Sequence, residues 1–90
     1  MPHFASTPDG IIQTETGELM PLEIKCPVSC EASDVDWIRD KKFVDNRQGN
    51  IYRMQLQMQI LLCKATRGTM FIYSRNSYQI IPDNLDKTFL

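Results

Sequence analysis

The sequence lacks the features of membrane-bound and exported chains. No apolar run approaches the ~20 residues that a membrane-spanning helix needs. No positively charged start leads into an apolar signal region either. We therefore expect an intracellular protein, in the cytoplasm or the nucleus, that does not bind a membrane.

Cysteine and histidine are scarce. The three cysteines, Cys26, Cys30 and Cys63, are an odd number without a regular framework, which argues against a disulfide scaffold. A zinc site formed by these thiols and His3 is an alternative, but the spacing is poor and Pro27 directly follows Cys26. We expect reduced, partly buried thiols instead.

The chain also lacks an excess of either charge, because its formal net charge is −1. Any binding of nucleic acid must therefore depend on a local basic patch. Ninety residues, of which 42% are hydrophobic and 23% charged, are typical of one small globular domain. No internal repeat or low-complexity tract interrupts this domain, which spans residues 1–90.

The first half of the sequence predicts a β-hairpin. Residues 10–13 and 19–26 are expected to be strands, joined by a polar, glycine-bearing loop at 14–17. Pro21 lies near the start of the second strand, which is tolerated at a sheet edge or a bulge, and Pro27 ends the strand.

This hairpin brings polar side chains together. Glu23 and Lys25 point to the same face of an extended strand, because side chains alternate between faces. If Asp9 lies on the neighbouring strand, its carboxylate approaches Glu23 across the ladder. Two carboxylates this close repel each other, and a divalent cation with oxygen ligands relieves the repulsion. A solvated ion pair on an exposed strand is the alternative interpretation of Glu23 and Lys25.

The middle of the sequence predicts two helices. The first covers about 36–44 and is capped by Ser33 or Asp34. Polar residues 46–50 are expected to connect it to a second helix at 51–64, which Gly68 follows as a stop signal. Alternation of glutamine with apolar residues at 55–60 also fits a strand, but helical spacing covers a longer stretch. The apolar face expected for this helix is Ile51, Met54, Met58, Leu61, Leu62 and Ala65.

Two further strands complete the prediction. Residues 69–73 and 78–81 are rich in apolar and aromatic residues and are separated by a turn at 74–77. The element order is then strand, strand, helix, helix, strand, strand. This order predicts an α/β fold with a mixed β-sheet flanked by helices.

Four blocks of sequence also match a known family, in the same order along the chain. They are Ser-Thr-Pro-Asp-Gly-Ile at 6–11, Leu-Glu-Ile-Lys-Cys-Pro at 22–27, Tyr-Arg-Met-Gln-Leu-Gln-Met-Gln at 52–59, and the strand pair at 70–73 and 79–81. With these blocks the chain resembles the lambda-exonuclease or YqaJ-like viral recombinase family of PD-(D/E)XK nucleases. The resemblance implies a restriction-endonuclease-like core.

The resemblance also implies a function: a metal-dependent exonuclease that hydrolyses phosphodiester bonds of duplex DNA ends, in DNA recombination or repair or in a virus or mobile element. Asp9 and Glu23 would bind Mg²⁺, or Mn²⁺ as a substitute, with the backbone carbonyl of Ile24. Lys25 would position and help to activate the attacking water. Gln55 matches the family position that supports the active site beside the lysine, and Gln57, which points away from it on a helix, ranks lower. Members of the family form rings around DNA, so a homo-oligomeric ring is a possible assembly.

Family members carry a longer N-terminal region, with a further acidic metal ligand, and usually continue into a C-terminal helix. The chain is thus expected to be the family core truncated at both ends, a partial domain. The alternative function is therefore an inactive fragment, or a DNA-binding or partner-binding remnant of such a nuclease. The basic residues available for phosphate contacts are equally well explained as a solvated helix face; they are Arg39, Lys41, Lys42, Arg47 and Arg53.

Overall fold

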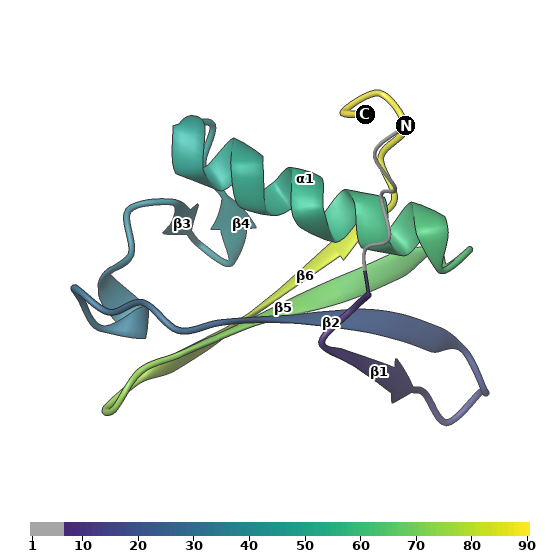
Figure 1. Ribbon diagram of the computed structural model, residues 1–90, viewed down its shortest axis with the longest axis horizontal. Helices are drawn as coiled ribbons and strands as arrows, with labels where there is room; N and C mark the ends of the chain where they lie inside the picture. The colour runs from purple at the N-terminus through teal and green to yellow at the C-terminus, as the bar shows by residue number, and fades with distance from the viewer. Residues whose placement is uncertain (1–6) are drawn as a thin grey trace.

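The computed structural model of the chain describes residues 7–90 and shows a mixed α/β fold (Figure 1). A four-stranded sheet has the strand order β1-β2-β5-β6, and a separate two-stranded sheet pairs β3 with β4. Ser6 of the first family block and His3 of the alternative zinc site lie outside the described residues. The elements are β1 (Gly10–Gln13), β2 (Leu19–Lys25), the 3-10 turn η1 (Ala32–Asp34), β3 (Ile38–Arg39), β4 (Lys42–Phe43), α1 (Arg47–Leu62), β5 (Arg67–Tyr73) and β6 (Tyr78–Asn84).

The predicted strands of the large sheet are confirmed, with ends that differ by at most a few residues. β1 and β2 pair in antiparallel fashion, β2 and β5 in parallel, and β5 and β6 again in antiparallel fashion. Pro21 lies in an interior strand rather than at the expected edge. The position is tolerated because the pairing of β2 with β5 begins only at Leu22, after the residue that has no N–H to donate.

The predicted helix at 36–44 is wrong, because this segment forms the hairpin of β3 and β4. Asp40 and Lys41 make the two-residue turn, with φ angles of 53° and 60°. Both angles are left-handed, as a type I′ hairpin turn requires, although neither residue is the usual asparagine or glycine. The hairpin places Trp37 in the core, where its ring lies 6.4 Å from Phe43 and 4.6 Å from Tyr52. Burial of these aromatic rings outweighs the local helical tendency.

The second predicted helix is confirmed as α1, but it begins earlier. Asn46 is the N-cap, and its side chain accepts a hydrogen bond of 2.8 Å from the Gly49 N–H. The expected connection at 46–50 therefore contains the cap and the first turn. The helix ends where Lys64 adopts a left-handed φ of 54°, so Lys64 and not Gly68 occupies the terminating position.

The buried face of α1 also differs from the prediction. The buried residues include Leu56 and Ile60 together with Gln57 and Gln59. Because two glutamines are buried, counting apolar residues alone placed the face on the wrong side of the helix. Most of the expected face lies on the outside and is at least partly exposed; its most exposed members are Ile51, Met54, Leu61 and Leu62.

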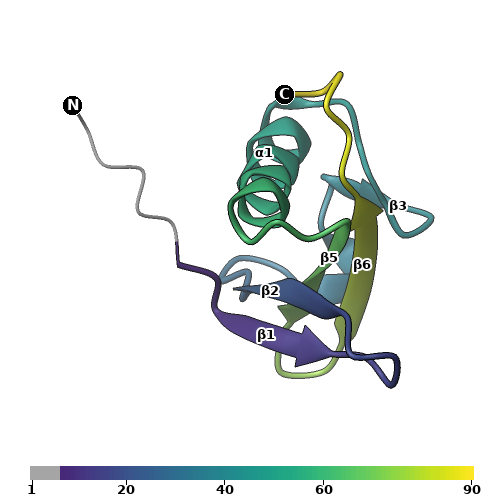
Figure 2. The same cartoon turned by 90° about the vertical axis from the view of Figure 1, so that its right-hand side faces the viewer.

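Helix α1 lies across one face of the large sheet, and the core is between them (Figures 1 and 2). Gly68 in β5 permits this close approach, since a Cβ at Gly68 would lie 2.9 Å from Ile60 and 3.1 Å from both Leu56 and Pro21. Pro21 precedes Glu23 and Lys25 on the same face of β2, so these two side chains also point toward α1. The sheet thus presents a carboxylate and an ammonium group beneath the helix.

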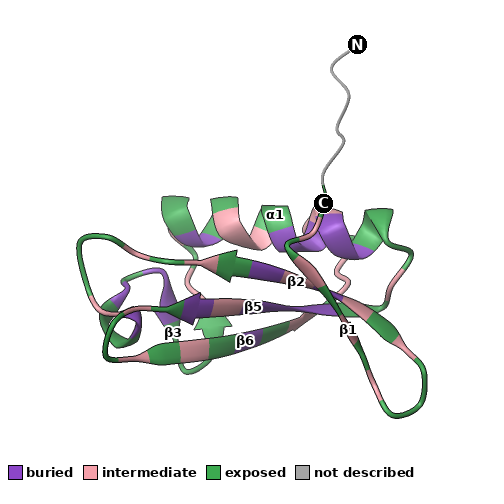
Figure 3. Ribbon diagram, turned by 60° about the horizontal axis from the view of Figure 1, so that its bottom comes forward, coloured by how far each residue is buried: buried purple, intermediate pink, exposed green. Residues whose placement is uncertain are grey.

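The opposite face of the sheet has no helix over it in the described residues. The outer strands β1 and β6 are largely exposed or half-buried, whereas β5 is mostly buried (Figure 3). The three cysteines are free and exposed, which corrects the expectation of partly buried thiols. In the described part of the chain, no helix has the length and apolar character that crossing a membrane requires.

Candidate functional site

The register of the first hairpin places the two predicted carboxylates opposite each other. Gly10 pairs with Leu22, so the next position along the ladder sets Asp9 across from Glu23. Asp9 is fixed there by its side chain, because Oδ2 accepts a hydrogen bond of 2.7 Å from the Ile24 N–H. The carboxylate of Asp9 therefore continues the ladder just beyond the end of β1.

Glu23 is buried, with 8% of its surface exposed. Burial is the largest cause that raises the pKa of its carboxyl, from an ordinary value of 4.5 to about 7. The negative charge of Asp9 and a side-chain hydrogen bond with Asp9 raise the pKa further, whereas the nearby charge of Lys25 lowers it. The Glu23 carboxyl therefore holds its proton close to neutral pH, because a buried carboxylate next to a second acid is costly to ionise.

The oxygen atoms at this position suit a magnesium ion. Carboxylates and carbonyl oxygens are hard ligands, and Mg²⁺ is commonly bound by one or two carboxylates while it keeps several waters. In a strand, the N–H and the C=O of one residue point toward the same neighbouring strand. The Ile24 N–H points to Asp9, so the Ile24 carbonyl points in that direction too. No group of three acidic, histidine or cysteine side chains that could hold a metal occurs within residues 7–90. The protein oxygens that could hold an ion at this position are thus two carboxylates and one carbonyl.

Lys25 lies beside this pair and contacts α1. Its Nζ is 4.6 Å from the centre of the Tyr52 ring, a cation–π contact. Trp37 in turn meets Tyr52 edge to face. The lysine is therefore held between the sheet and the helix, within electrostatic reach of Glu23.

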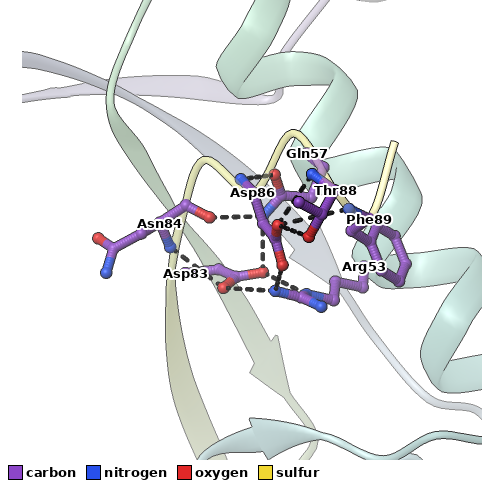
Figure 4. Close-up of polar contacts among 7 residues, drawn as sticks. All are labelled: Arg53, Gln57, Asp83, Asn84, Asp86, Thr88 and Phe89. Atoms are coloured by element: carbon purple, nitrogen blue, oxygen red, sulfur yellow. Dashed lines mark hydrogen bonds and ion pairs between the residues drawn. The ribbon is translucent and has the colours of Figure 1, made fainter.

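The two predicted glutamines have different surroundings. Gln55 is exposed, and its side chain makes no hydrogen bond with another described residue. Gln57 is fully buried on the β6 side of α1, where its amide donates 2.9 Å to Asp83 and 2.6 Å to the Asn84 carbonyl. Its Oε1 accepts 2.7 Å from the Asp86 N–H (Figure 4). Gln57 therefore attaches the C-terminal segment to the helix and is not next to Lys25.

Arg53 belongs to the same cluster as Gln57. Its Nε lies 2.9 Å from Asp83 and its Nη2 lies 3.3 Å from Asp86, and its guanidinium covers the Phe89 ring at 4.5 Å (Figure 4). The hydrogen bonds that Arg53 donates to Asp83 are the main cause that raises the pKa of Arg53. We call the group Arg53, Gln57, Asp83 and Asp86 the C-terminal cluster.

The other four basic residues are exposed. Lys41 and Lys42 line a hollow of about 500 Å³ together with Arg53, while Arg39 and Arg47 do not line it. The structure thus brings together three of the five residues that the sequence offers for phosphate contacts.

Some residues of this region were not predicted from the sequence. Tyr52 was expected only to pack, yet its ring contacts Lys25, and Asp83 was not considered although it pairs with Arg53. No local pattern could reveal either contact, because each joins elements far apart in the chain. Comparisons with protein-family models, with curated proteins and with solved structures found no match to this chain.

Proposed function

We propose that this chain carries the metal site of a Mg²⁺-dependent DNA nuclease of the lambda-exonuclease or YqaJ type. The observation that supports it most is the placement of Asp9 opposite Glu23, with Lys25 on the same face of β2. This arrangement agrees with the order of the sequence blocks at 6–11, 22–27 and 52–59. The sheet with α1 on one face would then be a restriction-endonuclease-like core.

In this proposal, Asp9, Glu23 and the Ile24 carbonyl hold the metal. When bound, the ion would polarise the scissile phosphate and stabilise charge on the attacking and leaving oxygens. Glu23 must first lose its proton, because a protonated carboxyl is a poor ligand. Burial therefore disfavours a charged Glu23 carboxylate unless a cation binds next to it.

Lys25 acts on the nucleophile in the same proposal. Its ammonium group lies within electrostatic reach of Glu23 and would donate hydrogen bonds to the attacking water, which orients the water and stabilises negative charge as the P–O bond forms. The Tyr52 ring limits where this amine can lie. The substrate would be the ends of duplex DNA, in recombination or repair or in a virus or mobile element. A ring of identical subunits and an intracellular location are further parts of the proposal.

A second candidate function is a DNA-binding or partner-binding module without turnover. It is favoured by the small number of ligands, because only two carboxylates meet at the site within the described residues. A cation held by two carboxylates and a carbonyl binds more weakly than one with a further acidic ligand.

Digestion of linear duplex DNA with Mg²⁺ or Mn²⁺ tests the proposal. Lys25→Met should lower the rate at least about 100-fold, the usual effect of removing a group that acts on the nucleophile. Lys64→Met is the matched control, since Lys64 is exposed at the end of α1 and should be dispensable. Activity that is equal in the wild type and Lys25→Met would contradict catalysis at this site. A folded wild type that binds DNA without cutting it would favour the second function.

A further inference from the structure

The hollow beside β4 has a composition that differs from the rest of the chain. Its volume is about 500 Å³, within the size range of small-ligand sites. Lys41, Lys42 and Arg53 provide three positive charges to its lining and Asp83 one negative charge. The lining is thus positive, although the whole chain has a net charge of −1.

The two lysines have no counter-ion in the described part of the chain. Neither Lys41 nor Lys42 makes an ion pair or a side-chain hydrogen bond with another described residue. The carboxylate that lines the hollow with them is Asp83, and it pairs with Arg53 instead. Both ammonium groups are therefore available to an anion.

Arg53 is held in place by ion pairs, and some of its N–H groups make no hydrogen bond with another described residue. Asp83 and Asp86 bind its Nε and Nη2, while Nη1 donates no hydrogen bond to another described residue (Figure 4). A guanidinium carries five N–H groups in a planar fork that matches phosphate oxygens. The C-terminal cluster thus holds an arginine in place at the wall of the hollow with free N–H groups on Nη1.

The β3–β4 hairpin holds its lysines in a costly arrangement. Lys41 adopts a left-handed φ of 60° without being glycine. Lys42 lies directly opposite Arg39 in the ladder, and like charges in that position repel. Strained backbone conformations of this kind are found most often at ligand-binding and active sites. A bound anion would relieve the repulsion between Lys42 and Arg39.

A row of ring contacts connects the hollow to the carboxylate pair. Phe43, which lines the hollow, lies 6.4 Å from Trp37, and Trp37 lies 4.6 Å from Tyr52. Tyr52 contacts Lys25 at 4.6 Å. Because buried aromatic rings pack rigidly, the hollow has a fixed position relative to Lys25.

We propose that this hollow binds a backbone phosphate of the DNA strand, away from the bond that is cut. The inference rests on the proposed function for its choice of ligand. Lys41, Lys42 and the free N–H groups of Arg53 bind the phosphate oxygens, and Phe43 and Pro82 pack against the sugar. The hollow thereby fixes the strand while the carboxylate pair acts on it.

Binding in the absence of divalent metal tests this inference without requiring hydrolysis. Amide resonances of the wild type are followed by NMR with EDTA while a short DNA duplex is added. Shifts are expected at 41–43, 53, 83 and 84, and inorganic phosphate at the same concentration should leave them nearly unmoved. Affinities of Lys42→Gln and Lys41→Gln are then compared with that of Lys64→Gln, an exposed lysine outside the hollow.

Each hollow variant should bind DNA about 5- to 10-fold more weakly near 0.1 M salt, and the salt dependence should fall by about 0.9 per lysine. Lys64→Gln should match the wild type. The inference is overturned if DNA does not shift these resonances, or if all three variants bind alike. Equal shifts with inorganic phosphate would also overturn it, in favour of a small-anion site. DNA binding in the hollow without any cleavage would refute the nuclease proposal alone.

Discussion

The C-terminal cluster and the carboxylate pair are two polar regions, each with one buried side chain, Gln57 and Glu23, and they have opposite organisation. In the C-terminal cluster, opposite charges meet, because Arg53 pairs with two aspartates. The side-chain amide of Gln57 forms hydrogen bonds with three groups of the neighbouring segment. In the carboxylate pair, like charges meet: Asp9 lies opposite Glu23, and burial raises the pKa of Glu23 to about 7. The first region has its partners within the described residues, whereas the second brings two acids together.

This difference separates a structural role from a chemical one. A buried polar group whose partners are all present adds to the stability of the fold. A buried acid beside a second acid destabilises the fold unless something positive binds there. We therefore expect substitutions in the C-terminal cluster to lower stability, and substitutions of the pair to raise stability while they remove metal binding.

The largest expected effect on stability is at Gln57. Gln57→Leu keeps the volume but leaves the Asp86 N–H and the Asn84 carbonyl without partners, so we expect a loss of about 2 to 3 kcal/mol in the free energy of unfolding. Gln55→Leu, two positions earlier on the exposed side of α1, should cost less than about 0.5 kcal/mol. Urea denaturation at pH 7 measures both. Similar losses in the two variants would mean that the cluster does not stabilise the fold.

The pair should make stability depend on pH in the absence of metal. The pKa of Glu23 is about 7 in the folded chain and near 4.5 when unfolded, so the folded state keeps a proton that the unfolded state releases between these values. The contribution of Glu23 to the free energy of unfolding is complete below pH 4.5 and is lost as the pH rises through 7. The full shift corresponds to about 3 kcal/mol, and since water reaches the exposed Asp9 we expect about 1 to 2 kcal/mol.

Glu23→Gln should remove this part of the pH dependence and make the protein more stable than the wild type at pH 8. Glu15→Gln, which changes an exposed acid in the hairpin loop, should leave the dependence as it is. Denaturation curves at pH 5 and pH 8 provide the comparison. If the curves of Glu23→Gln and the wild type shift equally with pH, the buried acid does not hold its proton near neutral pH.

The smallest expected effect is the coupling between Lys25 and Tyr52. A double-mutant cycle with Lys25→Met and Tyr52→Leu should give an interaction free energy of about 0.5 to 1 kcal/mol, the usual size of a partly exposed cation–π contact. Replacing Lys25→Met by Lys64→Met in the cycle should give no coupling. An interaction energy of zero for the first cycle would show that the ring does not hold the amine.

The strands of the large sheet could be predicted because their signal is local. Alternation along 10–13 and 19–26, with a glycine-bearing loop between them, fixes which side chains share a face. This alternation also predicted that Glu23 and Lys25 would share one face of β2, and Asp9 lies just beyond the end of β1, where it accepts a hydrogen bond from Ile24. The candidate site comes from a short-range pattern, and for that reason it was open to prediction.

The remaining features depend on contacts between distant elements. The β3–β4 hairpin turns at Asp40 and Lys41, which carry no turn signature, so 36–44 resembled a helix. The buried side of α1 was misplaced because Gln57 is buried by bonds to a segment nearly thirty residues away. Tyr52 meets Lys25 only through packing of the helix on the sheet.

Calorimetric titration with Mn²⁺ at pH 8 and pH 5.5 tests the central claim most directly, namely that Asp9 and Glu23 form a cation site. We expect one bound ion per chain at pH 8, binding that weakens markedly at pH 5.5, and release of protons on binding near pH 7, since the metal displaces the proton of Glu23. Asp9→Asn should weaken binding at least about tenfold, and Glu15→Gln should not. No binding at pH 8, or binding that is unchanged in Asp9→Asn, would contradict the account.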